Sequence, residues 1–332
     1  MKKTLCVLLT VSLISVFSGC GKGDSQNTTS FSTDAVTSAE TTQPETETQK
    51  ESGSETSETP DPEPMDKTTA KRKILYGKNT DTDSTYTGLE PLPKVKLPII
   101  DPNNLRGLST ETHNHSYGVS KNGVPHEISV NNQKLYEKYG ALCLDTSGDK
   151  VIYLTFDCGY ENGCTEKILD TLKEKQVPAA FFVTLPNVKE NPELIARMIK
   201  EGHIVGNHSD THPNFSKIDR TRMVTEIETL DNYLREHFGY SAPYFRFPEG
   251  ACSENALELV QSIGFTSVFW SSAYADWDTN NQKGKQYAFD TVTSRLHPGC
   301  VLLLHAVSQD NADALGDIID YAKAQGYEFK AL

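Results

Sequence analysis

The sequence has few long hydrophobic runs and little positive charge. The apolar run at its start, residues 5–17, is shorter than the roughly 20 residues that a membrane-spanning helix needs. Across all 332 residues, 32 Lys and Arg stand against 45 Asp and Glu, which gives a net charge of −13. Because nucleic acids attract basic surfaces, this balance argues against nucleic acid as a partner.

Cysteine is also sparse and follows no dense spacing. The seven cysteines stand at positions 6, 20, 143, 158, 164, 252 and 300. When the two in the first 20 residues are set aside, an odd number remains, without the pattern of a disulfide framework. A domain of this length does not need disulfide bonds to be stable. We therefore predict mostly free thiols.

Residues 1–20 are typical of a secretory signal peptide. A basic start precedes the apolar run, and Ser18-Gly19-Cys20 follows it. This ending resembles a lipoprotein cleavage box, which implies that Cys20 carries a lipid and anchors the protein to the outer face of the cell membrane. An ordinary signal peptide with an incidental cysteine is the alternative.

Composition divides the remaining chain into three parts. Residues 21–70 are rich in Ser, Thr, Glu and Pro, and they contain eleven acidic residues against three lysines. Such a segment cannot bury enough apolar surface to fold, so we expect a disordered acidic stalk. Residues 71–110 contain many Pro, Asn and Asp and are expected to form a loosely structured lead-in. Residues 111–332 form the predicted catalytic domain.

Short apolar strands alternate with amphipathic helices in this last part. Strands are expected at 151–156, 179–183, 203–206, 244–247, 266–270 and 301–304, and helices at 164–176, 192–201, 220–238 and 311–325. Thr165 and Asn191 are candidate helix caps. The alternation predicts a parallel α/β fold, either a barrel or a doubly wound sheet.

Polar residues stand at or just after the ends of four predicted strands: Asp157, Asn207-His208, Arg246 and His305. Chemistry gathers at the C-terminal ends of parallel strands, so we expect these residues to share one site. His208 and His212 are four residues apart, a spacing that directs two imidazoles at one zinc ion. Two surface histidines in a polar loop would show the same spacing.

Each of the other residues also has two interpretations. Asp157 is either a general base or a carboxylate that caps a turn. Arg246 either holds a carboxylate through two N–H groups or packs its stem on aromatic rings. His305 either protonates a leaving amine or is a hydrogen-bonded core histidine. Asp276 would keep His305 charged, with Trp277 as an apolar wall.

Five segments in this order resemble the polysaccharide deacetylases, the nodulation-protein-B-like or family 4 carbohydrate esterases. They are Thr-Phe-Asp-Cys-Gly at 155–159, Asn-His-Ser-Asp-Thr-His at 207–212, Arg-Phe-Pro-Glu-Gly at 246–250, Asp-Trp at 276–277 and Leu-Leu-His at 303–305. The resemblance covers residues 115–332. It implies an α/β fold, an irregular (β/α) barrel of about seven parallel strands.

The resemblance also implies roles for individual residues. The catalytic residues would be Asp157 as base, His305 as acid, Arg246 as the group that orients the base, and Asp276 as the group that tunes the acid. The ligands of a divalent metal, which we expect to be zinc, would be His208 and His212. The substrate would be contacted by Tyr160, Glu249 and Trp277, and a backbone N–H near Glu249 would stabilise the oxyanion.

Residue 158 departs from the family pattern. Most members have a metal-binding Asp at this place, and the muramic-δ-lactam-forming members have Asn. Cys158 is either a thiolate that completes a Cys-His-His zinc site or a neutral thiol. Segments 159–163, 202–208, 276–284 and 305–312 also resemble the lactam-forming branch. One departure is Glu249, where members of the branch commonly have Arg.

The branch implies a hydrolase that deacetylates N-acetylmuramic acid on the way to the muramic-δ-lactam of the spore cortex. Its partner would be a peptidoglycan strand without stem peptides, because a peptide on the lactyl carboxyl blocks lactam closure. One alternative is a deacetylase of N-acetylglucosamine in peptidoglycan or another polysaccharide. The other is a non-catalytic wall-binding lipoprotein.

Overall fold

The computed structural model describes residues 71–332, which belong to one compact unit. The predicted signal peptide, Cys20 and the predicted stalk lie outside the described residues. Within the described part, no helix is long and apolar enough to cross a membrane. Its five cysteines, Cys143, Cys158, Cys164, Cys252 and Cys300, are all buried and free, as the cysteine spacing predicts.

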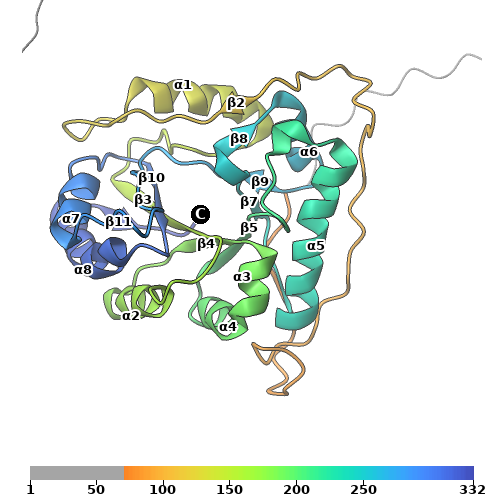
Figure 1. Ribbon diagram of the computed structural model, residues 1–332, viewed down its shortest axis with the longest axis horizontal. Helices are drawn as coiled ribbons and strands as arrows, with labels where there is room; N and C mark the ends of the chain where they lie inside the picture. The colour runs from red at the N-terminus through yellow and green to blue at the C-terminus, as the bar shows by residue number, and fades with distance from the viewer. Residues whose placement is uncertain (1–70) are drawn as a thin grey trace, which may run out of the picture. The chain divides into compact units, whose positions relative to one another are not determined.

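Seven parallel strands form one curved sheet (Figure 1). The strands are β3 (Val151–Cys158), β4 (Ala180–Val183), β5 (Ile204–Asn207), β7 (Tyr244–Phe245), β9 (Thr266–Ser267), β10 (Cys300–His305) and β11 (Glu328–Phe329). Their order is β10-β3-β4-β5-β7-β9, with β11 beside β3. Beyond β9, Ser272 pairs in parallel with Leu302 of β10, so the curve returns on itself. The predicted irregular barrel is confirmed.

Eight α-helices accompany the sheet in residues 71–332. They are α1 (Glu127–Tyr136), α2 (Thr165–Lys175), α3 (Leu185–Glu190), α4 (Pro192–Lys200), α5 (Arg220–Phe238), α6 (Glu254–Ser262), α7 (Lys285–Thr293) and α8 (Gln309–Ala324). The predicted apolar stripe of α2 is buried at Ile168, Leu169 and Leu172. Burial of one such face explains why these segments fold as helices against the sheet.

Of the two predicted helix caps, Thr165 is wrong and Asn191 is confirmed in its position. Cys164 occupies the cap position of α2, and Thr165 is already its first helical residue. Asn191 stands at the start of α4, but its side chain makes no capping bond there. Instead, its amide donates to the backbone oxygen and Oδ1 of Asn187, at 3.2 and 2.9 Å, because α3 ends directly before α4.

Alternation along β3 separates the helix side of the sheet from the barrel interior. Ile152, Leu154 and Phe156 belong to the large apolar core that also contains residues of α2, α4 and α8. Tyr153 packs instead on a smaller cluster with residues of β4, β5 and β10. Since successive side chains of a strand point to opposite faces, Asp157 follows the interior set and Cys158 follows the helix-facing set.

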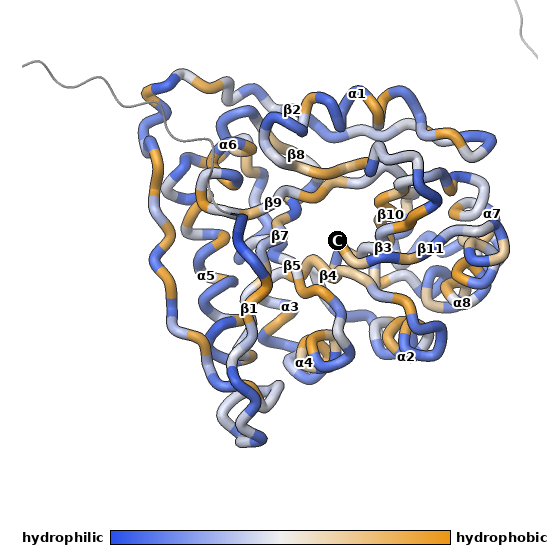
Figure 2. Tube along the Cα trace, turned by 180° about the vertical axis from the view of Figure 1, so that it is seen from behind, coloured by the Kyte–Doolittle hydropathy of each residue, from blue (hydrophilic) through white to orange (hydrophobic). Residues whose placement is uncertain are grey.

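The lead-in, residues 71–110, is bonded to the body of the domain. Its strand β1 (Leu75–Tyr76) pairs antiparallel with β6 (Tyr240–Ser241). Arg72 forms a 2.7 Å ion pair with the buried Asp231 of α5. The segment then runs beside α5 in both views (Figures 1 and 2). Its one strand in this range is β1, and specific polar contacts attach the segment to α5.

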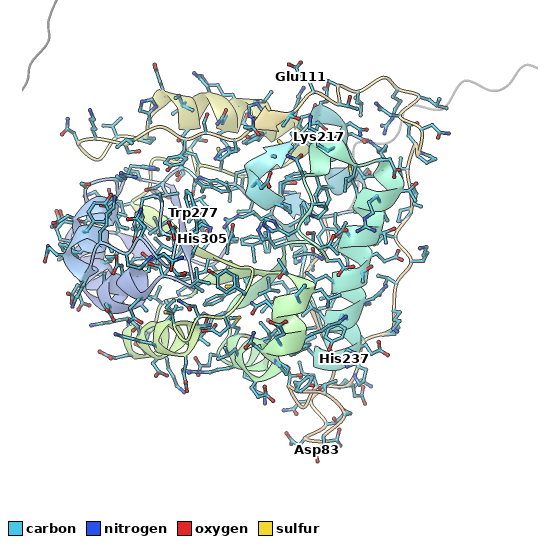
Figure 3. All side chains as sticks on the ribbon, viewed as in Figure 1. Asp83, Glu111, Lys217, His237, Trp277 and His305 are labelled. Carbon is cyan, nitrogen blue, oxygen red and sulfur yellow. The ribbon has the colours of Figure 1, made fainter. Side chains whose placement is uncertain are left out.

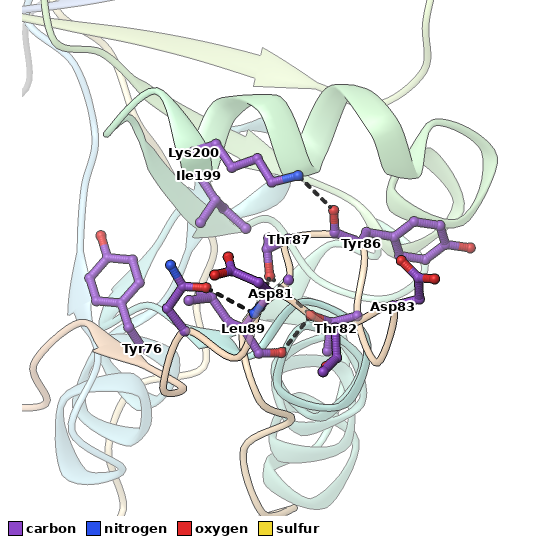
Figure 4. Close-up of a pocket in the computed structure, with 12 residues that line it drawn as sticks. Tyr76, Asp81, Thr82, Asp83, Tyr86, Thr87, Leu89, Ile199 and Lys200 are labelled. Atoms are coloured by element: carbon purple, nitrogen blue, oxygen red, sulfur yellow. Dashed lines mark hydrogen bonds between the residues drawn. The ribbon is translucent and has the colours of Figure 1, made fainter.

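A hollow of about 610 Å³ lies where residues 79–89 meet the end of α4 (Figure 4). Lys200 donates to the backbone oxygen of Tyr86 at 3.1 Å across it. The lining residues include Asp81, Asp83 and several threonines, but no histidine or arginine is among them. This hollow therefore lacks the residue types expected of the site and is distant in sequence from every predicted catalytic residue.

Candidate active site

A cleft of about 880 Å³ opens where strands β3, β5 and β10 end. Seven of the sequence-predicted site residues line it: Asp157, Tyr160, His208, His212, Glu249, Trp277 and His305. Figure 3 shows Trp277 and His305 next to one another near the end of β10. Arg246 and Asp276 lie buried behind the lining residues. The expectation that strand ends bring these residues together is thus met by their positions.

Asp157 is held by Arg246, a guanidinium with no solvent exposure. Arg246 Nη1 donates to Asp157 Oδ1 at 2.8 Å, and Nη2 donates to Thr155 Oγ1 at 2.9 Å. Burial alone would raise the pKa of Asp157, but the charge of Arg246, helped by His208 and His305, outweighs burial and lowers it. Asp157 is therefore an oriented, ionised carboxylate at neutral pH.

His208 presents an unprotonated nitrogen to the cleft. Its Nδ1 lies 2.8 Å from the backbone oxygen of Arg246, and because a carbonyl only accepts, Nδ1 must carry the proton. Burial lowers the pKa of His208 to about 4, so the ring is neutral and Nε2 keeps its lone pair. This Nε2 lies 3.7 Å from Asp157 Oδ2. The His212 ring centre is 4.8 Å from that of His208.

These two histidines suit a metal ion, because neutral imidazole nitrogen is a common ligand of zinc. The backbone brings them together in a tight loop, in which Ser209 and His212 both have positive φ, 74° and 56°. His212 N–H donates to Ser209 Oγ at 2.9 Å and closes the turn. Within residues 71–332, however, no group of three or more His, Cys, Asp or Glu side chains is arranged to hold a metal.

The proposal that Cys158 is a thiolate ligand is not supported by its surroundings. Its side chain belongs to the apolar core on the helix side of the sheet, and it does not line the cleft. Burial, followed by the neighbouring charge of Asp157, raises the pKa of the Cys158 thiol well above its ordinary value. Of the two interpretations of Cys158, these surroundings favour the neutral thiol over the zinc-bound thiolate.

His305 is oriented by Asp276, which also favours the charged form of the ring. Nδ1–H of His305 donates to Asp276 Oδ1 at 2.7 Å, and the backbone N–H of His305 donates to Oδ2 at 2.8 Å. Burial would lower the pKa of His305, but the hydrogen bond and charge of Asp276 raise it above its ordinary value. Asp276 itself is 2% exposed. The arrangement leaves Nε2 of His305 to deliver a proton in the cleft.

Two exposed aromatic side chains stand at the cleft. Tyr160 is 49% and Trp277 57% exposed, which is unusual for aromatic rings of this size. The Trp277 ring centre is 5.8 Å from that of His305. Flat apolar faces beside polar groups are typical of sites that bind ligands. Both residues thus have the position that a substrate contact requires.

Glu249 lies in a strained turn at the cleft. Its φ of 60° is in the left-handed region, and its Oε2 accepts from Asn214 Nδ2 at 3.3 Å. The next residue, Gly250, also has a positive φ, and a Cβ there would come within 2.8 Å of the Trp270 ring. The turn therefore requires a glycine at this position, with Glu249 held beside it.

Sequence reasoning missed several lining residues, among them Tyr117, Asp210, Trp270 and Tyr274. Trp270 ends a predicted strand and could have been found by that position. Tyr117 had no such signal, because its segment shows no hydrophobic periodicity. The half-buried His115 lies behind Trp270: its Nδ1 is 2.9 Å from the Tyr136 hydroxyl, and its Nε2–H donates to the backbone oxygen of Trp270 at 2.7 Å. Burial lowers the pKa of His115 to about 3.

Comparison with known proteins places these residues in a family context. A family model described as polysaccharide deacetylase matches residues 144–268. The peptidoglycan-N-acetylmuramic acid deacetylase PdaA of Bacillus subtilis strain 168 is 44% identical over 223 residues, which are 67% of this chain and 85% of that protein. The peptidoglycan-N-acetylglucosamine deacetylase of Bacillus cereus is 33% identical over 204 residues, 59% of this chain and 72% of that protein.

The solved structure of Bacillus subtilis PdaA, a family 4 carbohydrate esterase, has the same fold. It matches with a TM-score of 0.65 at 43% identity, over 68% of this chain and 96% of that chain. The likeness therefore spans nearly the whole length of the solved protein.

Proposed function

The chain belongs to the polysaccharide deacetylases, the family 4 carbohydrate esterases, and we propose that it removes the N-acetyl group of N-acetylmuramic acid in peptidoglycan. One observation carries this proposal. The Asp157 carboxylate and the His305 imidazole, each fixed by a buried partner, face the same cleft. The 44% identity to a muramic acid deacetylase supports the choice of sugar.

Asp157 is the general base. Its carboxylate is ionised and fixed by Arg246, so it accepts a proton from water that attacks the acetamide carbonyl. His305 is the general acid, and its charged form gives a proton to the departing amine. Acetate and a free amino sugar are the products. A backbone N–H near Glu249 stabilises the negative charge that develops on the carbonyl oxygen.

His208 and His212 would hold a divalent metal, which we propose is zinc. When bound, such an ion supplies Lewis acidity that polarises the acetamide carbonyl. The lone pair of His208 Nε2 is available for this because the Arg246 carbonyl fixes the tautomer. Cys158 takes no part, since its thiol faces the core.

The aromatic rings give the cleft its sugar-binding walls. Tyr160 and Trp277 offer exposed flat faces on which the apolar side of a sugar ring can pack. Trp277 lies beside His305, so a sugar that rests on it brings its acetamide near the acid. Glu249 contacts the substrate from the turn that also provides the oxyanion donor.

Muramic acid gives the reaction a chemical consequence. Its freed amine stands beside a lactyl carboxyl group and is able to close a lactam, the modification found in spore cortex. A stem peptide on that carboxyl blocks closure, so the substrate is a peptide-stripped strand. We further propose that Cys20 is lipidated and holds the enzyme on the outer face of the membrane, where it meets the wall.

Mass spectrometry of treated glycans tests the substrate. The purified protein with added zinc is given peptide-stripped peptidoglycan strands and, separately, N-acetylglucosamine oligomers. We expect acetyl loss from muramic acid. Loss from the oligomers alone would keep the enzyme class and replace the sugar by N-acetylglucosamine. No loss from either substrate, with several metals tried, would favour a wall-binding protein without catalysis.

A further inference from the structure

We propose that Asn311 is a positioning residue for the acid His305 and acts through Asp276, an inference that rests on the proposed function. Asn311 lies in the first turn of α8, is fully buried and does not line the cleft. Its Nδ2 donates to Asp276 Oδ2 at 2.6 Å. Asn311 thus does not line the cleft, but it binds the carboxylate that holds His305 Nδ1, and its Nδ2 also donates to the backbone oxygen of His305 at 3.3 Å.

The orientation of the Asn311 amide follows from its neighbours. An ionised carboxylate only accepts hydrogen bonds, so the group that faces Asp276 must be the NH₂. The other end of the amide, Oδ1, accepts from the Tyr274 hydroxyl at 2.5 Å. Four groups are therefore connected: Tyr274 donates to Asn311, and Asn311 and His305 both donate to Asp276. The carboxylate fixes which end of the amide faces it.

The start of α8 brings Asn311 behind Asp276. Strand β10 ends at His305, and Ser308 caps the helix by accepting from Asn311 N–H at 3.2 Å. This short connection fixes the first helical turn against the acid. Asparagine is a weak helix former and costly to bury, so a buried amide at this position indicates that its hydrogen bonds matter.

An uncharged hydrogen-bond donor suits the position beside Asp276. A Lys or Arg in its place would cancel the negative charge that His305 needs, and a carboxylate would repel Asp276. Asn311 and the backbone N–H of His305 together occupy Asp276 Oδ2. Oδ1 is thereby directed at His305 Nδ1. Without Asn311, Oδ2 keeps only its bond to the His305 backbone N–H, so the carboxylate and the imidazole that it holds are less firmly oriented.

Two substrates with different leaving groups distinguish a role in positioning the acid His305 from an effect on the stability of the whole protein. An amine leaves only when protonated, whereas the phenolate of 4-nitrophenyl acetate leaves without a proton. For Asn311→Leu we expect kcat for deacetylation of peptide-stripped strands to fall about 10- to 100-fold. KM and the rate on the aryl ester should stay within about twofold. Equal loss on both substrates, or no loss on either, would overturn the role.

Asn255→Ala is the matched control. Asn255 is another buried asparagine at the start of a helix, but its Oδ1 accepts from Arg220 at 2.8 Å, away from the cleft. Its loss should lower the melting temperature without separating the two rates. If Asn311→Leu does not fold, Tyr274→Phe removes only the distal hydroxyl and should lower deacetylation about 2- to 10-fold.

A double-mutant cycle tests whether Asn311 acts through Asp276. In an Asp276→Ala background, Asn311→Leu should change the deacetylation rate less than about twofold, because the group it positions is gone. Losses that multiply would contradict the proposal. If the unmodified enzyme hydrolyses the aryl ester but deacetylates no glycan, the proposed function fails and the role of Asn311 fails with it, an outcome distinct from a failure of the cycle alone.

Discussion

Arg246 Nη1 lies 2.8 Å from Asp157 Oδ1, and the guanidinium that makes this contact has no solvent exposure. A buried ion pair of this kind is sensitive to the loss of one partner, because the remaining charge is left without compensation. The pair both orients Asp157, the proposed base, and keeps its carboxylate ionised. Several consequences can be measured.

Removal of the Arg246 charge should weaken the fold and the base together. We expect Arg246→Met to lower the free energy of unfolding by about 3–5 kcal/mol, measured by denaturant titration. Since Arg246 lowers the pKa of Asp157, its loss raises that pKa. The acid limb of kcat/KM should therefore move to higher pH. Arg246→Lys, which keeps the charge, is the control, and an unmoved acid limb in the Met variant would refute the assignment.

Asp276→Asn should move the basic limb of the pH profile to lower pH. Asp276 raises the pKa of His305, so its replacement lets that pKa fall. His305 must be protonated to act as the acid. In the variant, activity should therefore begin to fall at a lower pH than in the unmodified enzyme. A pH profile of kcat on the glycan measures this shift. An unchanged basic limb would show that His305 is not the acid.

Cys158→Ala should leave the metal affinity unchanged. The side chain faces the core, so its loss affects packing and costs about 1 kcal/mol or more of stability. Zinc affinity by calorimetry and activity at saturating zinc should stay within about twofold. A loss of affinity of about tenfold or more, the scale expected for a direct ligand, would restore the thiolate interpretation.

Chelation should abolish activity reversibly. Dialysis against a chelator is expected to stop acetate release, and added zinc should restore it. In His208→Ala, which removes the fixed Nε2 lone pair, zinc should restore little at the same concentration. The surface variant His237→Ala is a control, since His237 lies at the far end of α5. Full activity in the presence of chelator would rule out metal dependence.

The sequence predicts Asp157, His208, Arg246 and His305 as one site for a physical reason. Each follows an apolar strand, and parallel strands end on the same edge of a sheet. The ligand role considered for Cys158 rested on its residue type and on the metal-binding Asp that most family members have there. Neither shows that the thiol is packed in the apolar core.

Other features could not be read from periodicity. Helix α1 was not predicted, because its buried face is mostly polar, with Ser129, Asn132 and Gln133. These side chains satisfy backbone groups of neighbouring segments and leave no apolar stripe in the sequence. The contact between Asn311 and Asp276 joins residues 35 positions apart. Such polar contacts depend on packing that local patterns do not encode.

The central claim is that Asp157 takes the proton from water during deacetylation. Its most direct test compares acetate release from peptide-stripped peptidoglycan by the unmodified enzyme and by Asp157→Asn, both saturated with zinc and both shown to be folded by circular dichroism. We expect the rate of the variant to be at least about 100-fold lower. A variant that keeps more than about a tenth of the rate would contradict the claim, because a general base of this kind contributes at least about 100-fold.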